Sequence, residues 1–303
     1  MADRKRNEKR HLRRTREQVI EKVLAACALA TVLTSAGIIW VLVSESWGFF
    51  RVVPLREFLF DTEWTPLFTN KRYGILPLLS GTFLTTVIAM VTAVPLGIVI
   101  AVYLNEYATR GFRKAVKPIL ELLAAVPTVV YGFFALTVVT PFLQTFIPGV
   151  GSFNALSAGL VMGIMIMPVI SSLSEDALHA VPRSLREASY GMGATRFQTA
   201  FRVMVPAAAS GIMVSVILGL ARAVGETMVV AIAAGQQPSL TLDPRESVET
   251  ITAYIVQVSL GDVPHGSLEY KTIFAAGITL FLFTFLLNNM SFWLKKKYQE
   301  KYE

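Results

Sequence analysis

The chain has 303 residues, 53% of them hydrophobic and 16% charged, and it carries a formal net charge of +7 at pH 7. So large an apolar share, with so few charges to cover it, argues against a soluble globular protein and predicts an integral membrane protein.

The N-terminus is strongly basic. Nine of the 28 lysines and arginines lie in residues 1–22, which we expect to contact anionic lipid headgroups rather than nucleic acid. The uncharged run from Val23 to Val43 follows at once, and its length exceeds the apolar core of a signal peptide. We therefore predict a first membrane span near residues 22–44 and an extracytoplasmic loop that ends near residue 72.

Further long uncharged runs follow along the chain. The run from Leu122 to Ser174 is too long for one crossing, because as a single helix it would measure roughly 80 Å. Proline and glycine residues between positions 141 and 151 supply a turn that divides it into two. The remaining five spans are predicted near residues 77–104, 119–144, 154–174, 207–234 and 272–294. The fold class is therefore all-α, with six transmembrane helices and no strand.

Basic residues predict the orientation of these spans, because short basic segments stay on the cytoplasmic side. Segments 1–22, 105–118, 175–204 and 295–303 together hold 21 of the 28 lysines and arginines, whereas the segments on the opposite side hold six. Both termini are therefore expected to be cytoplasmic, and the protein is placed in the cell membrane with multiple crossings.

Signatures of catalysis and of cofactor binding are absent from the sequence. The single cysteine, Cys27, lies in the first predicted span, and the three histidines fall in three different segments, so we predict no metal site. No phosphate-cradling G-x-x-x-x-G-K-[ST] loop and no nucleophile elbow occurs. We therefore expect neither a cofactor nor an enzymatic activity in this chain.

The segment between the fourth and fifth spans is too structured for a simple connector. Pro182 suits the start of a helix, and Gly191 and Gly193 permit a sharp break before a second helix from about Thr195. This second helix is expected to end before Pro206. The pattern on its own is equally compatible with a surface helical hairpin.

Seven positions in this segment resemble the EAA loop of ABC importer permeases, whose pattern is E-A-A-x3-G-x9-I-x-L-P. They are Glu187, Ala188, Ser189, Gly193, Val203, Val205 and Pro206. In that family the loop forms a coupling helix that fits into a groove of the ATPase subunit. The resemblance implies a type I importer permease fold, also called MetI-like, and it makes Glu187, Ala188 and Gly193 the residues that contact the ATPase.

Other runs, such as ELLAAVPTVVYGFF and GLARAVGETMVVAIAAG, are similar to the PstC-type permeases of phosphate importers. The resemblance extends from about Gly74 to Lys297. Together with the charge pattern it divides the chain into the basic segment 1–22, a first span with its loop at 23–72, a permease core at 73–297 with the coupling loop 182–206, and a cytoplasmic tail at 298–303. It implies four kinds of partner: a PstA-type permease subunit, a PstB-type ATPase dimer, a PstS-type phosphate-binding protein and inorganic phosphate.

Two charged residues, Arg222 and Glu226, lie inside the fifth predicted span, where a charge costs roughly 2.5–3.5 kcal/mol on insertion scales. At 100° per residue they lie 40° apart on one helix face. Small residues share this face: Gly211, Ser215, Gly219 and Gly225. The face therefore permits a close helix contact or a cavity, and we expect the pair to point into the protein.

The pair has two interpretations. It is either an internal salt bridge that fixes the packing, or a substrate site in which the Arg222 guanidinium binds phosphate oxygens while Glu226 orients it and limits how tightly the anion is held. The resemblance favours translocation of inorganic phosphate by alternating access, driven by a separate ATPase. A permease for sulfate or molybdate, an ion-coupled secondary transporter and a membrane scaffold remain alternatives.

Overall fold

The computed structural model describes residues 2–298, and nearly all of the secondary structure in that range is helical. The described β pairing is a single isolated antiparallel bridge between Trp64 and Tyr73. This confirms the predicted all-α class.

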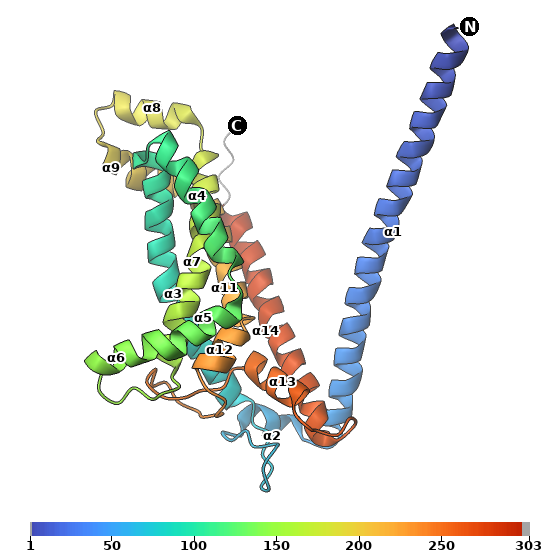
Figure 1. The fold of residues 1–303 in the computed structure, drawn as a ribbon, viewed down its shortest axis with the longest axis vertical. Helices are drawn as coiled ribbons and strands as arrows, with labels where there is room; N and C mark the ends of the chain where they lie inside the picture. Colours follow the sequence, from blue (N-terminus) through green and yellow to red (C-terminus); the bar gives the residue numbers. More distant parts are fainter. Residues whose placement is uncertain (1, 299–303) are drawn as a thin grey trace.

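The helices of the described chain are given below in three consecutive groups in chain order, with the labels of Figure 1. The first group holds α1 (Ala2–Phe50), α2 (Leu55–Phe60), α3 (Leu76–Val102) with its π-helical end η1 (Tyr103–Tyr107), and α4 (Arg110–Ala125). The second holds α5 (Thr128–Phe134), η2 (Ala135–Val139), α6 (Thr140–Phe146) and α7 (Ala155–His179). The third holds α8 (Arg183–Gly191), α9 (Arg196–Thr199), η3 (Ala200–Met204), α10 (Val205–Ala207), α11 (Ala209–Val224), α12 (Met228–Ala233), α13 (Ile251–Leu260) and α14 (Leu268–Tyr298).

Five helical stretches are long and apolar enough to cross a membrane, and a sixth is formed if the bent pair 196–207 and 209–224 counts as one span. The two halves of this pair meet at 72°. The five stretches cover Glu17–Phe50, Leu76–Tyr107, Thr128–Phe146, Ala155–His179 and Leu268–Met290. The predicted count of six spans is therefore reached with the bent pair included.

The third predicted span, residues 119–144, is wrong as a single helix. Helix α4 ends at Ala125, and Val126 takes an extended conformation with φ −62° and ψ 132°. The cause is Pro127, because a proline ring disfavours helical backbone in the residue before it. The apolar helical stretch begins only at Thr128.

The core is built on the close crossing of α3 and α7. An added Cβ at Gly163 of α7 would lie 2.8 Å from the Ala89 carbonyl oxygen of α3, and one at Gly159 would lie 2.7 Å from the Ile88 side chain. Apolar side chains of α7, among them Met162 and Ile166, are fully buried in the cluster that surrounds this contact. Both helices run without a break despite Pro95 and Pro168 in their interiors.

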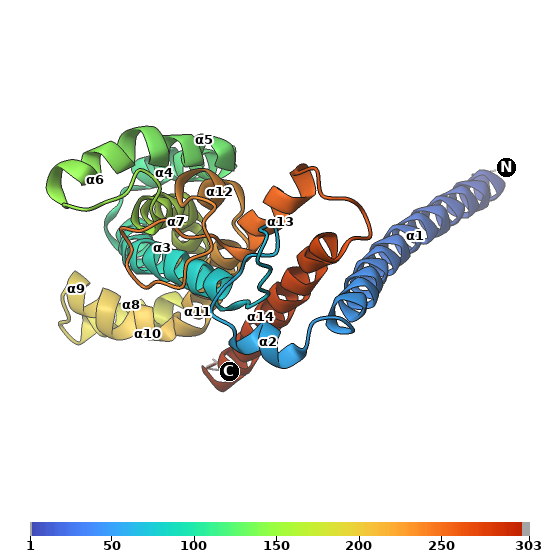
Figure 2. The same cartoon turned by 90° about the horizontal axis from the view of Figure 1, so that it is seen from below.

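Helix α1 stands apart from the rest of the molecule, with α14 between it and the bundle (Figures 1 and 2). None of its most apolar window is buried within the chain. It meets α14 near its C-terminal end, where the Ser46 hydroxyl donates a hydrogen bond to the Phe274 carbonyl oxygen at 2.9 Å. The apolar part of α1 therefore has only lipid or another subunit to pack against.

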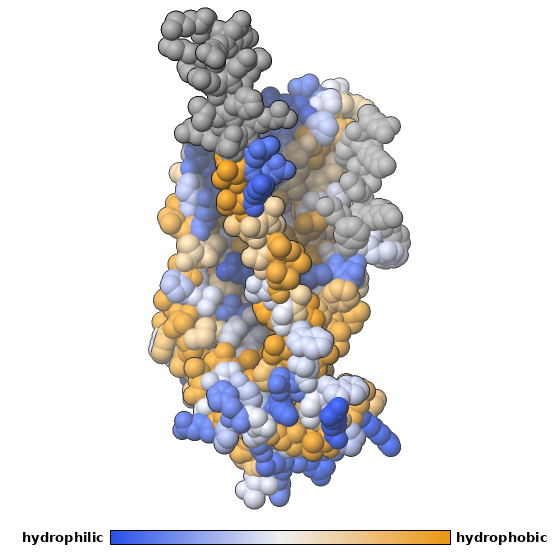
Figure 3. Space-filling model, turned by 90° about the vertical axis from the view of Figure 1, so that its right-hand side faces the viewer, coloured by the Kyte–Doolittle hydropathy of each residue, from blue (hydrophilic) through white to orange (hydrophobic). Residues whose placement is uncertain are grey.

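The start of α1 and the end of α14 lie at the same end of the molecule as α8 and α9, whereas α2 and α13 lie at the other end (Figure 1). Hydrophilic side chains gather at the end that carries α2, and apolar side chains cover most of the flank next to it (Figure 3). The two ends of the described chain and the segment expected to couple to an ATPase thus share one side.

The α3–α7 contact gives a first prediction. Substitution Gly163→Val inserts a branched side chain against the α3 backbone and should lower the free energy of unfolding by about 1–3 kcal/mol. Gly111→Ala in α4, where an added Cβ meets nothing within 4 Å, should leave it unchanged or raise it. Thermal unfolding of the two variants in detergent measures the difference. Equal midpoints would contradict the tight crossing.

Candidate translocation site and coupling loop

The fifth predicted span is a broken helix, and the break lies beside the two intramembrane charges. Helix α11 ends at Val224 with Gly225 as its C-cap, and Thr227 has φ −120° and ψ −55° before α12 begins at Met228. The angle of 100° per residue therefore holds for Arg222 but not for Glu226. The expectation of an i, i+4 pair on one helix face is wrong, because the helix stops between the two residues.

Glu226 caps the second half of this broken helix. Its carboxylate oxygen Oε1 accepts hydrogen bonds from the backbone N–H groups of Met228 at 3.2 Å and Val229 at 3.3 Å. Its backbone carbonyl accepts a hydrogen bond of 2.6 Å from the Thr252 hydroxyl. The residue is 8% exposed. A carboxylate in this position satisfies N–H groups that have no partner inside the helix and interacts favourably with the positive end of its dipole.

Arg222 lies in the last turn of α11 and is half-buried. Within the described part of the chain its guanidinium has no carboxylate within 4.0 Å and no hydrogen-bond partner, so it does not form the internal salt bridge that was one interpretation. Arg222 lies close enough to Tyr131 of α5 for its positive charge to interact electrostatically with the Tyr131 phenol. The guanidinium donors of Arg222 are therefore free to bind an anion.

The small residues above Arg222 form a helix contact and not a cavity. An added Cβ at Gly211 would lie 2.5 Å from the Ala177 Cβ, and one at Gly219 would lie 2.8 Å from the Ile170 side chain. Between them, the Ser215 and Ser174 hydroxyl oxygens lie 2.7 Å apart in a buried hydrogen bond. Helix α11 thus packs on α7 down to Gly219, and Arg222 follows one turn further on.

Residues 182–207 form the predicted helix, glycine turn and second helix. Gly193 has φ +80°, a left-handed conformation that residues with a side chain rarely adopt. Thr195 caps α9 in a capping box with Gln198, and the Ser189 and Thr199 hydroxyl oxygens join the two helices at 2.9 Å. The expected end before Pro206 is wrong, because the π-helical turn η3 leads into α10 and places Pro206 where its missing N–H matters little.

The surface of this loop is open. Glu187 and Ala188 are exposed on α8, and Gly193 is exposed in the turn with nothing within 4 Å of an added Cβ. The side chains of Met192 and Phe197 beside them are 88% and 63% exposed. Apolar side chains at the tip of a helical hairpin are a surface that another protein can cover.

Several ion pairs hold the coupling loop and α4 to the core. The sequence alone did not predict them. The Arg186 guanidinium of α8 lies 2.7 Å from the Glu106 carboxylate of η1, which is nearly inaccessible to solvent. The carboxylate of Glu175 in α7 is buried and contacts both Arg113 and Lys117 of α4. Lys117 also contacts the more exposed Asp176. In the sequence these carboxylates lie just beyond the ends of long uncharged runs.

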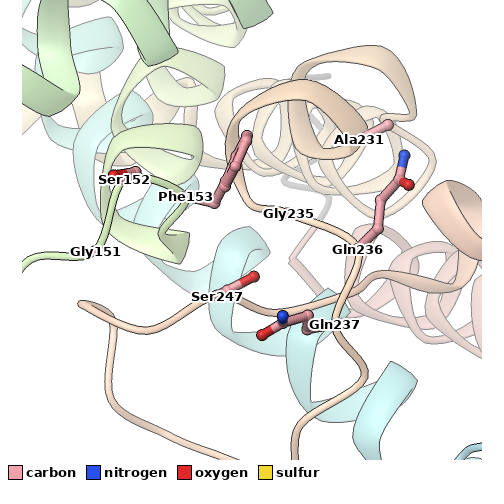
Figure 4. A pocket seen from close by; sticks show the side chains of 8 residues that line it. All are labelled: Gly151, Ser152, Phe153, Ala231, Gly235, Gln236, Gln237 and Ser247. Atoms are coloured by element: carbon pink, nitrogen blue, oxygen red, sulfur yellow. The ribbon is translucent and has the colours of Figure 1, made fainter.

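A cavity of about 650 Å³ lies at the opposite end of the molecule. Figure 4 shows its lining, which combines the polar side chains of Ser152, Gln236, Gln237 and Ser247 with apolar surface from Phe153 and Ala231. Its residues are Gly151, Ser152, Phe153, Ala231, Gly235, Gln236, Gln237 and Ser247. Neither Arg222 nor Glu226 lines it. Residues of the described chain offer no group of three or more His, Cys, Asp or Glu that could hold a metal ion.

Comparison with known proteins places this architecture in a family. The sequence profile of the family described as "Binding-protein-dependent transport system inner membrane component" matches residues 93–300. The chain belongs to this family. It is a multi-pass membrane protein, and the relatives that it matches are transport permeases.

Three relatives match along most of their length. The "Probable ABC transporter permease protein YqgH" of Bacillus subtilis is 38% identical over 87% of this chain and 86% of that protein. The "Phosphate transport system permease protein PstC" of Xylella fastidiosa strain 9a5c is 34% identical over 91% and 90%. Its namesake in Mesorhizobium japonicum is 32% identical over 89% and 87%.

Solved structures show the same fold at lower identity. A bacterial alginate ABC transporter in complex with its periplasmic protein matches with a TM-score of 0.61 and 20% identity, over 90% of this chain and 95% of that one. The MetNI methionine ABC transporter in an inward-facing conformation matches with a TM-score of 0.56 and 18% identity, over 75% and 95%. The expected MetI-like fold is therefore confirmed.

The ion pair beneath the coupling loop gives a second prediction. Arg186→Ala leaves the Glu106 carboxylate buried without a cation, which should lower the free energy of unfolding by about 1–3 kcal/mol. The value stays below that of a fully buried pair because Arg186 is partly exposed. Hydrogen exchange of α8 should also become faster. Glu187→Gln, on the exposed face of the same helix, is the control and should change neither quantity. An Arg186→Ala variant with unaltered exchange would contradict the anchoring role.

Proposed function

We propose that this permease is the PstC-type subunit of an ATP-driven importer that moves inorganic phosphate across the cell membrane by alternating access. Two lines of support converge. PstC relatives align over about nine-tenths of the chain. The observation that carries the proposal is the half-buried Arg222 guanidinium, which stands at a helix break in the membrane without a carboxylate partner among the described residues. An intramembrane charge of this kind is by default a candidate for a substrate path.

The geometry suggests different roles for Arg222 and Glu226. Arg222 offers a planar fork of N–H donors suited to phosphate oxygens. The Glu226 carboxylate accepts hydrogen bonds from the first N–H groups of α12 and so stabilises the helix break beside Arg222. Its negative charge also weakens the binding of an anion. Weak binding serves transport, because a substrate that is held too tightly is not released. Non-helical residues between α11 and α12 are the natural hinge for alternating access.

The energy for this cycle comes, in our proposal, from a PstB-type ATPase dimer that docks on the coupling loop through Glu187, Ala188 and the turn at Gly193. A PstA-type permease completes the translocation path, and a PstS-type protein delivers phosphate on the outer side. Both termini then lie in the cytoplasm with the coupling loop. The chain itself carries no catalytic residues and is a transport subunit.

Two alternatives lead to different experimental results. The relative from B. subtilis is named only as a probable ABC transporter permease, so sulfate or molybdate is the second candidate substrate. An ion-coupled secondary transporter would leave the exposed apolar tip of the coupling loop without a role. Phosphate uptake by vesicles that contain the permease and its three protein partners, with and without ATP, separates a secondary transporter from an ATP-driven importer. Competition by sulfate and molybdate identifies the anion.

The Arg222 site gives a third prediction. Arg222→Gln removes charge-assisted hydrogen bonds that are each worth about 1.5–3 kcal/mol, so ATP-driven phosphate uptake should fall roughly tenfold to a hundredfold or more. Assembly with the partners and basal ATP hydrolysis should remain. Arg56→Gln on the exposed helix α2 is the matched control and should keep full uptake. Normal uptake by the Arg222 variant would refute the proposed site.

The coupling loop gives a fourth prediction. Gly193→Val forces a β-branched residue to φ +80°, which costs about 1–3 kcal/mol locally and should distort the turn. Co-purification of the ATPase and stimulation of ATP hydrolysis by loaded binding protein should both decline. Gly191→Ala, two residues earlier and with nothing within 4 Å of the added Cβ, should retain both. Intact coupling in the Gly193 variant would exclude this turn from the interface.

A further inference from the structure

A carboxyl group that the proposed mechanism does not use is buried at the end of the molecule opposite the coupling loop. Glu249 precedes α13, is 1% exposed, and its Oε1 atom has no hydrogen-bond partner. Its side chain lines a small cavity of about 50 Å³. The loop before α3 contributes Trp64 to the same cavity, and Trp64 Nε1 is also buried without a partner.

The surroundings of Glu249 determine its charge. The cavity is lined by Trp64, Pro66, Leu67, Phe68, Gln236, Pro238, Glu249, Tyr254 and Gln257, and none of these is a cation. Burial, with no opposing positive charge, raises the pKa of Glu249 from its ordinary value to about 8. At neutral pH the group is therefore an uncharged carboxylic acid whose O–H is a hydrogen-bond donor.

The polar groups around the cavity suit an anion more than a cation. A neutral carboxyl, two glutamine amides and an indole N–H all offer donors, and a cation would instead require the ionised carboxylate. Uncharged donors bind an oxyanion without the strong attraction of a lysine or arginine, which suits a site that must pass its ligand on. Gln236 also lines the 650 Å³ cavity of Figure 4, so the small cavity adjoins the larger one.

We propose that the Glu249 cavity is an outer subsite for the transported oxyanion, in which the neutral Glu249 carboxyl donates a hydrogen bond to an anion oxygen. The subsite rests on the proposed transport function and extends it to a second place on the path. When Glu249 loses its proton, the carboxylate repels the anion and the subsite no longer binds it.

A short chain of contacts joins this subsite to the helix break. Glu249 is followed by Thr250, whose hydroxyl oxygen lies 3.0 Å from that of Thr252. The Thr252 hydroxyl in turn donates to the backbone carbonyl of Glu226 at 2.6 Å. An anion that shifts the 249–252 segment therefore acts directly on the residue that caps α12.

The fluorescence of Trp64 tests the subsite without relying on transport. Trp40, Trp47 and Trp293 are replaced by Phe, so that Trp64 is the one tryptophan left in the chain, and the purified full-length permease is titrated from pH 6 to 10. A transition near pH 8 is expected to report the ionisation of Glu249. Tyr254 and Tyr73 do not interfere, because burial raises the pKa of both phenols above the ordinary value. Glu249→Gln should abolish the transition.

The decisive measurement is the effect of an oxyanion on this transition. An anion bound to the neutral carboxyl stabilises the protonated form, so sodium phosphate should move the transition to higher pH, whereas sodium chloride of equal ionic strength should not. A shift with sulfate but not with phosphate would keep the subsite and overturn phosphate as substrate. A transition that neither oxyanion moves, or one that persists in Glu249→Gln, would overturn the subsite.

Uptake provides the second readout. With saturating binding protein, the maximal rate of phosphate uptake should fall as the pH rises through about 8 in the unmodified permease, because Glu249 then ionises. Glu249→Gln keeps a neutral donor and should remove this decline, while Glu249→Leu lacks the donor and should transport slowly at every pH. A Glu249→Gln variant with the unmodified pH profile would contradict the role of the carboxyl.

Discussion

A helix that stops inside an apolar layer exposes N–H and C=O groups that no lipid can satisfy, and this constraint governs the centre of the permease. The break after Val224 is tolerated because Glu226 accepts from the first N–H groups of α12 and because Thr252 donates to the Glu226 carbonyl. The same residues that make the break possible leave Arg222 at the end of α11 without a carboxylate partner among the described residues. One arrangement thus provides hydrogen-bond partners for the backbone at the break and leaves the Arg222 guanidinium without a carboxylate partner among the described residues.

The rest of the structure divides into a closely packed part and a part built from bent and broken helices. Glycines let α3 and α7 cross at the closest approach that side chains allow, and buried carboxylates tie α4 and α8 to the ends of this pair. The bent and broken part is the chain from Arg196 to Ala233, with α13 packed against its end. A movement of the coupling loop would therefore reach Arg222 through α11, which packs on α7 through small residues.

Much of the fold could be predicted from the sequence because membrane spans and turn residues have strong local signals. Long uncharged runs located the spans, and the proline and glycines of residues 182–193 located the helix, turn and second helix between the fourth and fifth spans. The break at Pro127 was also encoded, since a proline restricts the residue before it, but a continuous apolar run concealed it. Gly225 ends one helix, and Glu226 and Thr227 precede the next; these residue types mark helix ends in a sequence, but an analysis of periodicity alone overlooked them.

The roles of Arg222 and of the coupling residues stay predictions about function, whereas Glu249 carried no local signal in the sequence. A glutamate in a polar loop normally faces water, and only the fold reveals its burial.

The isolation of α1 has a consequence for how the protein can exist in a cell. A helix of 49 residues whose apolar window is covered by nothing in its own chain gains almost nothing from intramolecular packing there. Its position along that stretch is fixed by the surrounding bilayer or by a neighbouring subunit. A permease extracted from the membrane therefore has to cover this helix with detergent wherever lipid or another subunit covered it before.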